Sequence, residues 1–405
     1  MFFPFLLALL FLDAPSQEPS RPAGPTFPEA VQMATDGRDA DALAAFQQLA
    51  AARPNDHDAR LWIARLHERM GHRDLAEPVY HSVFLEDPAN LDAALGVASM
   101  MLARDVAEQA IEVLEVAEAR APRNAAVLAL LGRGHRLAGR TARALVYFER
   151  AAAAAPTEEH RLGLEAARRA YFHHIETRGF SEQFSGGTPD SRSGDLIVNY
   201  RLTERLRALA RGQVQRKFTE TEGRGGGGVE WRWKPAIALR GQVLIGPDNL
   251  VMPEGDYLGE IEHTRGPVTW TASVRHFDFT GARMTTASPA VAWLASEKVS
   301  LGFEYALSWT EVSTSRFVEA GHSAHLRAAY RLWPRVWAQT GYAAGVDDFE
   351  DFSIDRIGDF RANAVSGGVR VELPRLTSFI GSYQRQWRSG NVEMGRVTVS
   401  LQQRF

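Results

Sequence analysis

Charged and amide side chains recur at alternate positions through the second half of the chain, and their types suit them to hold a polar ligand. The series comprises Arg207, Arg211, Gln213, Gln215, Glu230, Arg232, Arg240, Gln242, Glu260, Glu262, Glu304, Arg327, Arg370 and Arg404. Alternate residues of a β-strand share one face, so the series predicts one polar surface. That surface could hydrogen-bond sugar hydroxyls or an anionic chain. The alternative is that facing arginines and glutamates pair with one another and fill the space between them.

Residue types for covalent catalysis are sparse. His263, His276, His322 and His325 are candidate general bases by type, but no Gly-x-Ser-x-Gly turn accompanies them. The chain has no cysteine, which excludes thiolate metal sites, cysteine nucleophiles and disulfides. We therefore expect no enzyme activity, no metal site and no cofactor.

A second charged series lies in the first half of the chain and has helical spacing. It comprises Asp58, Arg65, Glu68, Arg69, Asp92, Arg133 and Arg136. On the first helices of successive helical hairpins, these residues would line a concave groove that binds a partner protein. The alternative is an ordinary solvated face, and the mixed signs identify no ligand.

The elements that carry this second series repeat with a period of 34 residues. The recurring positions are a proline (Pro54, Pro88, Pro122, Pro156), a small residue (Ala42, Ala76, Ala110, Ala144), a large apolar residue (Phe46, Tyr80, Leu114, Phe148) and a turn residue (Gly37, Gly71, Asp105, Gly139). The turn residue joins two antiparallel helices, and the small residue lets them pack closely. The pattern resembles the tetratricopeptide repeat over residues 23–158 and implies four helical hairpins. A further helix at 158–170 would cap the array, so we place this domain at 23–170.

The first series lies in a region of a different kind, which begins near residue 171. Residues 237–245, 299–309 and 397–405 alternate apolar and polar side chains, as strands with two unlike faces do. In a transmembrane barrel the apolar face meets lipid and the polar face lines the lumen. The main alternative is a soluble β-sandwich, in which the apolar faces are buried against each other.

Connection lengths favour the barrel. Six connections are very short (203–204, 234–235, 265–267, 296–297, 333–334 and 373–374), and those between them are mostly longer (185–193, 219–227, 246–256, 311–316 and 344–358), with shorter exceptions near Gly281 and Gly390. This alternation is typical of outer-membrane barrels. It predicts about fourteen antiparallel strands over residues 171–405, with twelve as the alternative. Near the short turns lie Trp233, Trp293, Trp333 and Trp337, as an interfacial girdle requires.

Both ends of the sequence are typical of an exported barrel. Residues 2–12 form an apolar run that is too short to span a bilayer and suits a signal peptide, which we place at 1–16. At the other end, alternating apolar residues lead to Phe405. This resembles the terminal signal by which the barrel-assembly machinery recognises outer-membrane proteins, although Gln403 departs from it.

Taken together, these residues indicate an α + β multidomain chain: a tetratricopeptide α-solenoid followed by a transmembrane antiparallel β-barrel at 171–405. This architecture resembles the YaiO family over roughly residues 160–405, and it is similar to exporters of exopolysaccharide, whose repeat arms are longer. The resemblance implies the Gram-negative outer membrane, with the repeats in the periplasm. It implies assistance in exporting an envelope polymer such as exopolysaccharide. The alternative is a non-conducting scaffold that recruits a periplasmic partner through the groove.

The expected partners follow from this reading. They are outer-membrane lipid, the barrel-assembly machinery through the last strand, a periplasmic protein through the repeats, and polysaccharide. A net charge of −3 supplies no strong basic field for nucleic acid, which we do not expect as a partner.

Overall fold

The computed structural model describes residues 24–185, 187, 189–313, 318–345, 353–354 and 362–405. The signal peptide predicted at 1–16 lies outside these residues. By its internal contacts the chain divides into two compact units, one that ends at Pro122 and one that begins at Arg123. The second unit therefore holds the fourth helical hairpin and the capping helix together with the barrel.

The described helices alternate with short turns in chain order. They are α1 (Phe27–Thr35), α2 (Asp39–Ala52), α3 (His57–Arg69), α4 (Arg73–Glu86), α5 (Leu91–Ala103), α6 (Ala107–Arg120), α7 (Ala125–Leu137), α8 (Thr141–Ala154) and α9 (Glu158–Tyr171). The predicted array of four hairpins and a cap is therefore confirmed. None of the described helices is long and apolar enough to cross a membrane.

Local chemistry explains where these helices begin and turn. The side chains of Asp56, Asn90 and Asn124 accept hydrogen bonds from the first turns of α3, α5 and α7, so each caps a helix two residues after a repeat proline. The predicted turn residues Gly37, Gly71, Asp105 and Gly139 all have positive φ angles, between 60° and 85°. Glycine adopts that conformation without strain, which explains its recurrence there.

Close helix packing depends on the small residues of each repeat. Ala42, Ala76, Ala110 and Ala144 are all buried. A Cβ atom at Gly96 would lie 2.1 Å from the ring of Tyr80, so only glycine lets this ring pack against α5. The repeat pattern therefore encodes contacts between neighbouring helices.

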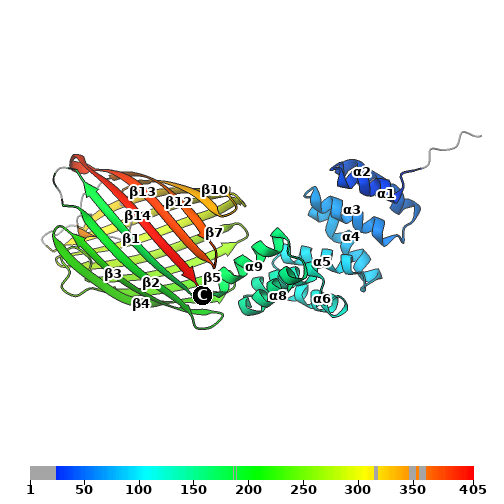
Figure 1. The fold of residues 1–405 in the computed structure, drawn as a ribbon, viewed down its shortest axis with the longest axis horizontal. Coiled ribbons are helices and arrows are strands. Elements are labelled where there is room, and N and C mark those ends of the chain that lie inside the picture. The colour runs from blue at the N-terminus through cyan, green and yellow to red at the C-terminus, as the bar shows by residue number, and fades with distance from the viewer. Residues whose placement is uncertain (1–23, 186, 188, 314–317, 346–352, 355–361) are drawn as a thin grey trace, which may run out of the picture. The chain divides into compact units, whose positions relative to one another are not determined.

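The strands close into one antiparallel barrel. They are β1 (His174–Phe184), β2 (Ser191–Arg201), β3 (Leu206–Lys217), β4 (Glu220–Lys234), β5 (Ile237–Ile245), β6 (Gly255–Arg265), β7 (Val268–Phe279), β8 (Ala282–Ser296), β9 (Val299–Val312), β10 (Val318–Trp333), β11 (Val336–Ala344), β12 (Ala362–Leu373), β13 (Thr377–Arg388) and β14 (Val392–Arg404). Each strand pairs with its neighbours in sequence, and β1 pairs with β14, as Figure 1 shows. The prediction of fourteen strands is confirmed, and the sandwich alternative is wrong.

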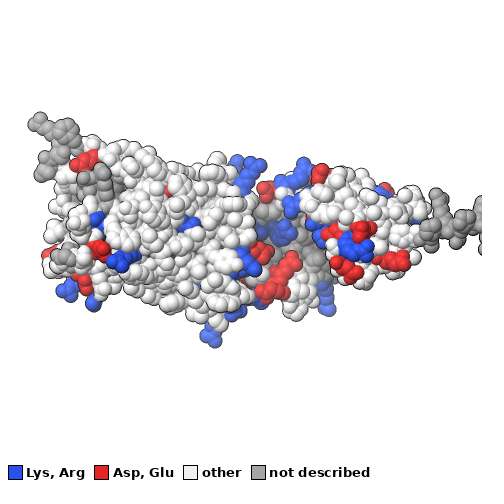
Figure 2. Space-filling view, turned by 90° about the horizontal axis from the view of Figure 1, so that it is seen from above, with Lys and Arg blue, Asp and Glu red and all other residues white. Residues whose placement is uncertain are grey.

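The outer surface of the barrel carries an apolar band. Leu301, Phe303, Tyr305, Leu307 and Trp309 of β9 are all exposed on this side. Figure 2 shows few charged side chains over the middle of the barrel face in view, while they gather toward its ends. In transmembrane barrels, an apolar outer band of this kind is the surface that contacts lipid.

The prediction of a long loop at 219–227 is wrong. Strands β3 and β4 are joined by Phe218 and Thr219 alone, both with positive φ angles, and the glycine run at 225–228 lies inside β4. Glycine usually weakens a strand, but here it allows close approach between strands. A Cβ atom at Gly226 or Gly228 would lie 2.0 or 2.2 Å from a carbonyl oxygen of β5.

Two smaller expectations also change. Strand β9 extends to Val312, so the connection predicted at 311–316 begins later than expected. Trp337 is on the inward face of β11, because it pairs in register with Arg370 and its ring lies 5.7 Å from the Arg331 guanidinium. Trp233, Trp293 and Trp333 are exposed, as a girdle requires.

Candidate functional site: the barrel lumen

The polar series of the second half lies on the inward face of the barrel. Along β3, for example, Arg211, Gln213 and Gln215 are buried, whereas the intervening Gly212 and Val214 are exposed. The same alternation places on this face Arg207, Glu230, Arg232, Arg240, Gln242, Glu260, Glu262, Glu304, Arg327, Arg370 and Arg404. Ten of the fourteen residues of the series therefore lie on β3 to β6.

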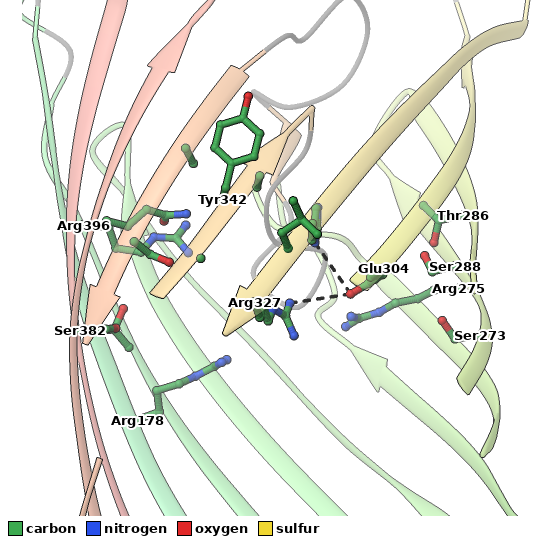
Figure 3. A pocket seen from close by; sticks show the side chains of 18 of the residues that line it. Arg178, Ser273, Arg275, Thr286, Ser288, Glu304, Arg327, Tyr342, Ser382 and Arg396 are labelled. Carbon is green, nitrogen blue, oxygen red and sulfur yellow. Dashed lines mark ion pairs between the residues drawn. The ribbon is translucent and has the colours of Figure 1, made fainter. Parts of the chain in front are cut away.

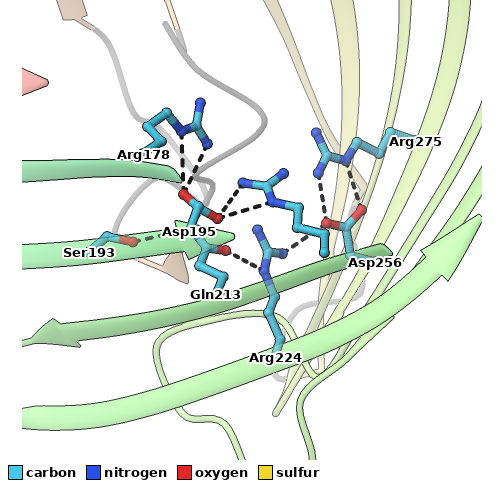
Figure 4. Close-up of polar contacts among 8 residues, drawn as sticks. Arg178, Ser193, Asp195, Gln213, Arg224, Asp256 and Arg275 are labelled. Atoms are coloured by element: carbon cyan, nitrogen blue, oxygen red, sulfur yellow. Dashed lines mark hydrogen bonds and ion pairs between the residues drawn. The ribbon is translucent and has the colours of Figure 1, made fainter. Parts of the chain in front are cut away.

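An ionic layer crosses the lumen near the end with the longer loops. Asp195 lies 3.2 Å from Arg178 and 3.0 Å from Arg211. Figure 4 shows its carboxylate with Arg178 on one side. Asp256 lies likewise between Arg224 and Arg275, at 2.8 and 2.7 Å. Both carboxylates are at most 1% exposed, so each depends on its arginines for the interactions that water would otherwise supply.

A third carboxylate extends the layer around the seam of the barrel. Glu182 of β1 accepts a hydrogen bond of 3.0 Å from Nε of Arg396 on β14. Its other oxygen lies 3.7 Å from Nζ of Lys217 on β3. Arg224 also donates to the amide oxygen of Gln213 at 2.6 Å. Arg211 and Gln213, two members of the predicted series, are therefore bound to other polar side chains of the barrel wall, as the alternative of internal pairing expects.

The sequence series includes Arg211 and Gln213 but omits the other residues of this layer. These are Arg178, Glu182, Asp195, Lys217, Arg224, Asp256, Arg275 and Arg396. Their signal was available, because each has the same strand parity as the inward residues of its own strand. Arg224 and Asp256 lie inside the connections predicted at 219–227 and 246–256, so the predicted strands stop before them.

Beyond the ionic layer the lumen holds a polar cavity of about 560 Å³. Its hydroxyl lining comprises Ser273, Thr286, Ser288, Ser366, Ser382 and Thr398. Glu304 lies 3.7 Å from Arg327 and 3.8 Å from His325. Figure 3 shows Glu304 and Arg327 directed at each other. Arg240, also in the lining, lies 3.3 Å from Glu260. The cavity therefore presents hydroxyl groups interleaved with opposite charges that lie next to each other.

A second cavity of about 580 Å³ continues toward the short turns. It shares Glu304, His325 and Arg327 with the first, and Thr269, Thr271 and Gln339 also line it. Small residues on the inward face of β7 to β13 leave this space open. The lumen is therefore asymmetric, with a charged wall on one side and a hollow on the other.

The end with the short turns is joined to the helices of the same unit. Arg169 of α9 is ion-paired with Glu372 of β12, and the Arg207 guanidinium donates to the carbonyl oxygens of Ala170 and Phe172. The Glu204 carboxylate accepts from the backbone N–H of Ala142, in the first turn of α8, at 3.1 Å. An anion at a helix N-terminus and a cation at a C-terminus both stabilise the helix dipole.

The predicted groove residues fall in both compact units. In the first, Arg65 lies 2.7 Å from Asp92, Arg69 pairs with Asp39, and Tyr80 donates to Glu68 at 3.2 Å. These contacts join α3 to α2, α4 and α5. Asp58 is exposed on α3, whereas Arg133 and Arg136 are exposed on α7 of the second unit.

The four candidate histidines are spread over both faces. His325 is buried in the lumen, and His263, His276 and His322 belong to the outward parity of their strands. His276 contacts the Thr285 hydroxyl at 2.9 Å and the Asp278 carboxylate at 3.3 Å. Among the residues that the structure describes, no cluster of three His, Asp or Glu side chains suits a metal ion.

Comparison with known proteins gives structural similarity only. No protein-family model and no curated protein matches the chain. A thermophilic TPR protein from Thermus thermophilus is 25% identical, over 35% of this chain and 78% of that one, with a TM-score of 0.33. MamA from Desulfovibrio magneticus is 19% identical, over 35% of this chain and 80% of that one, with a TM-score of 0.32.

Proposed function

We propose that this protein resides in the bacterial outer membrane and assists the passage of an uncharged polyhydroxyl polymer, such as an exopolysaccharide. The outer-membrane location is supported by the closed barrel, by its exposed apolar band and by the resemblance to the YaiO family. In this orientation the short turns and the helices face the periplasm, and the longer loops face outward.

The cavity carries the proposal for a polysaccharide. Its hydroxyl groups can donate and accept hydrogen bonds, as sugar hydroxyls do. Glu304 lies beside Arg327, and Glu260 lies beside Arg240. A polyanion would have to compete with these carboxylates for their arginines, whereas a neutral glycan could bind without breaking the pairs.

The helices supply the second part of the proposal. The fourth hairpin and α9 are joined to the rim of the barrel, so a periplasmic protein bound to that hairpin would be held near the mouth of the lumen. We assign binding and guidance to this chain, and no chemical step.

One observation favours a second candidate function, the non-conducting scaffold. Phe277, Phe279, Ala282 and Met284 form an apolar cluster on the inward faces of β7 and β8, near the longer loops. Where apolar side chains narrow a lumen, they block ions by excluding water. On this reading the barrel is an anchor and the repeats are the functional part.

Planar-bilayer recording with the full chain tests both candidates. We expect neutral dextran oligosaccharides to block the current, and oligogalacturonate of equal length to block it less. Glu304→Gln should shift this preference toward oligogalacturonate, because Arg327 loses its carboxylate neighbour. The control is Glu311→Gln, on the outward face of the same strand. A folded barrel that neither conducts nor binds these sugars would favour the scaffold.

A further inference from the structure

The loop between β5 and β6 turns into the barrel. Val251 and Met252 are only 7% and 1% exposed, whereas the neighbouring Leu250 is 55% exposed. Asn249 fixes the base of the loop, because its side-chain amide donates to the carbonyl oxygens of Gly223 and Pro253 at 3.2 and 3.3 Å. Two consecutive apolar side chains therefore lie inside a barrel whose middle is polar.

A single carboxylate holds the tip of this loop. Glu222 of β4 accepts hydrogen bonds from the backbone N–H groups of Leu250, Val251 and Met252, at 2.6, 3.0 and 2.7 Å. Three successive amides that converge on one anion form a compact binding nest. Hydrogen bonds to a charged acceptor are among the stronger ones in proteins, so this contact is a strong attachment of the loop tip.

The same loop contacts Ile354, which lies between β11 and β12 in the chain. The backbone N–H of Ile354 donates to the carbonyl oxygen of Val251 at 2.9 Å, and Ile354 packs against the apolar cluster of β7 and β8. The adjacent Ser353 is fully buried and accepts a hydrogen bond from Lys217 of β3 at 2.9 Å. Backbone and apolar side chains therefore bridge from β3 and β4 to β7 and β8.

We propose that the β5–β6 loop is a plug that closes the long-loop end of the lumen, and that Glu222 is its latch. Release of the three amides from Glu222 would let the loop swing out, because exposed amides can bond to water instead. The polar cavity would then communicate with the outside. This inference adds a closed resting state to the proposed function and holds whether or not a polymer passes.

The absence of cysteine makes the plug directly measurable. Met252→Cys introduces a single thiol at the buried tip, and Leu250→Cys provides a matched control at the exposed neighbour. Both are treated with a membrane-impermeant maleimide in the full-length protein in lipid vesicles. We expect Leu250→Cys to react quickly and Met252→Cys to react slowly.

Loss of the latch should expose the buried thiol. In the Met252→Cys background, Glu222→Ala should raise the labelling rate at least about tenfold, since each lost charge-assisted bond is worth roughly a factor of ten. Glu222→Gln should give a smaller rise, because its amide oxygen still accepts. The charge control is Glu220→Gln, an exposed residue at the start of β4, which should change nothing.

Conductance gives a second readout. Glu222→Ala should increase the time that the barrel spends open, provided that gel mobility before and after heating shows it folded. Unchanged labelling of Met252→Cys in folded Glu222→Ala protein would overturn the latch. Increased labelling without conductance would keep the plug and refute passage through the lumen, so the two proposals fail separately.

Discussion

Arg169, in the last turn of α9, is ion-paired with Glu372 at the end of β12, 203 residues further along the chain. The Glu372 side chain is only 12% exposed, and it also lies 3.2 Å from Arg370. One carboxylate on the inner rim thus joins the capping helix to the barrel wall. It is one of several contacts that join the end of the helical array to the strands within one compact unit.

Reversing one charge of this pair should loosen α9. We expect Arg169→Glu to weaken the attachment by about 1 kcal/mol, the usual scale for a partly exposed ion pair. Chymotrypsin cleavage after Tyr171 or Phe172 measures the loosening, because the substitution leaves these sites intact. A several-fold faster cut is expected. The double variant Arg169→Glu/Glu372→Arg should restore much of the protection, and no recovery would argue against direct pairing.

The glycines within β4 should be intolerant of side chains. Gly228→Val would place a Cβ atom 2.2 Å from the carbonyl oxygen of Gly241, so the strands must separate. Forced overpacking of this kind typically costs about 1–3 kcal/mol, and a clash with backbone relaxes poorly. We expect a lower temperature for loss of the folded band in gel-shift assays. Gly212→Ala is the control, because its Cβ meets nothing within 4 Å; equal effects of the two would contradict this explanation.

The helical array should carry a pH-dependent contribution from Glu86. Hydrogen bonds from the Arg60 guanidinium hold the pKa of this carboxyl at about 2, below its usual 4.5. The folded-state pKa is depressed, so the stabilisation is fully present above about pH 4.5 and is lost as the pH falls toward 2. We therefore expect Arg60→Gln to lower the unfolding temperature at pH 7 and to have little effect near pH 2.

Thermal unfolding followed by circular dichroism at 222 nm, where helices dominate, checks this prediction. Arg73→Gln is the matched control, since Arg73 is an exposed arginine on α4. Its effect should not depend on pH over this range. A destabilisation by Arg60→Gln that persists undiminished at pH 2 would show that the Glu86 pairing does not account for it.

Much of this architecture is local and could be read from the sequence. A turn glycine, a small residue and a large apolar residue spaced within 34 positions specify one helical hairpin, because their contacts lie within a repeat or its neighbour. Strand alternation likewise follows from a period of two, which assigns Arg211 inward and Val214 outward before any partner strand is known. Tight turns at proline and glycine separated most of the strands.

Alternation alone did not predict which inward side chains pair with one another and which line open space. It placed Arg211 and Glu304 on the same surface, yet Arg211 is buried in the ionic layer and Glu304 borders an open cavity. That difference depends on the side chains that strands distant in sequence bring opposite, such as Asp195 for Arg211. Composition does not indicate this difference, because arginines and carboxylates occur both in the ionic layer and around the cavity.

The sequence by itself determined the repeat array, the barrel, the number of strands and the polarity of each strand face, since all of these follow from periodicities within a few dozen residues. Only the tertiary structure decided where the lumen is filled, where it is hollow, and how its ends are held. Those features depend on contacts across the barrel: Glu222 with the tip of the β5–β6 loop, and Arg169 with Glu372. Chain closure creates these contacts, and no short-range pattern encodes them.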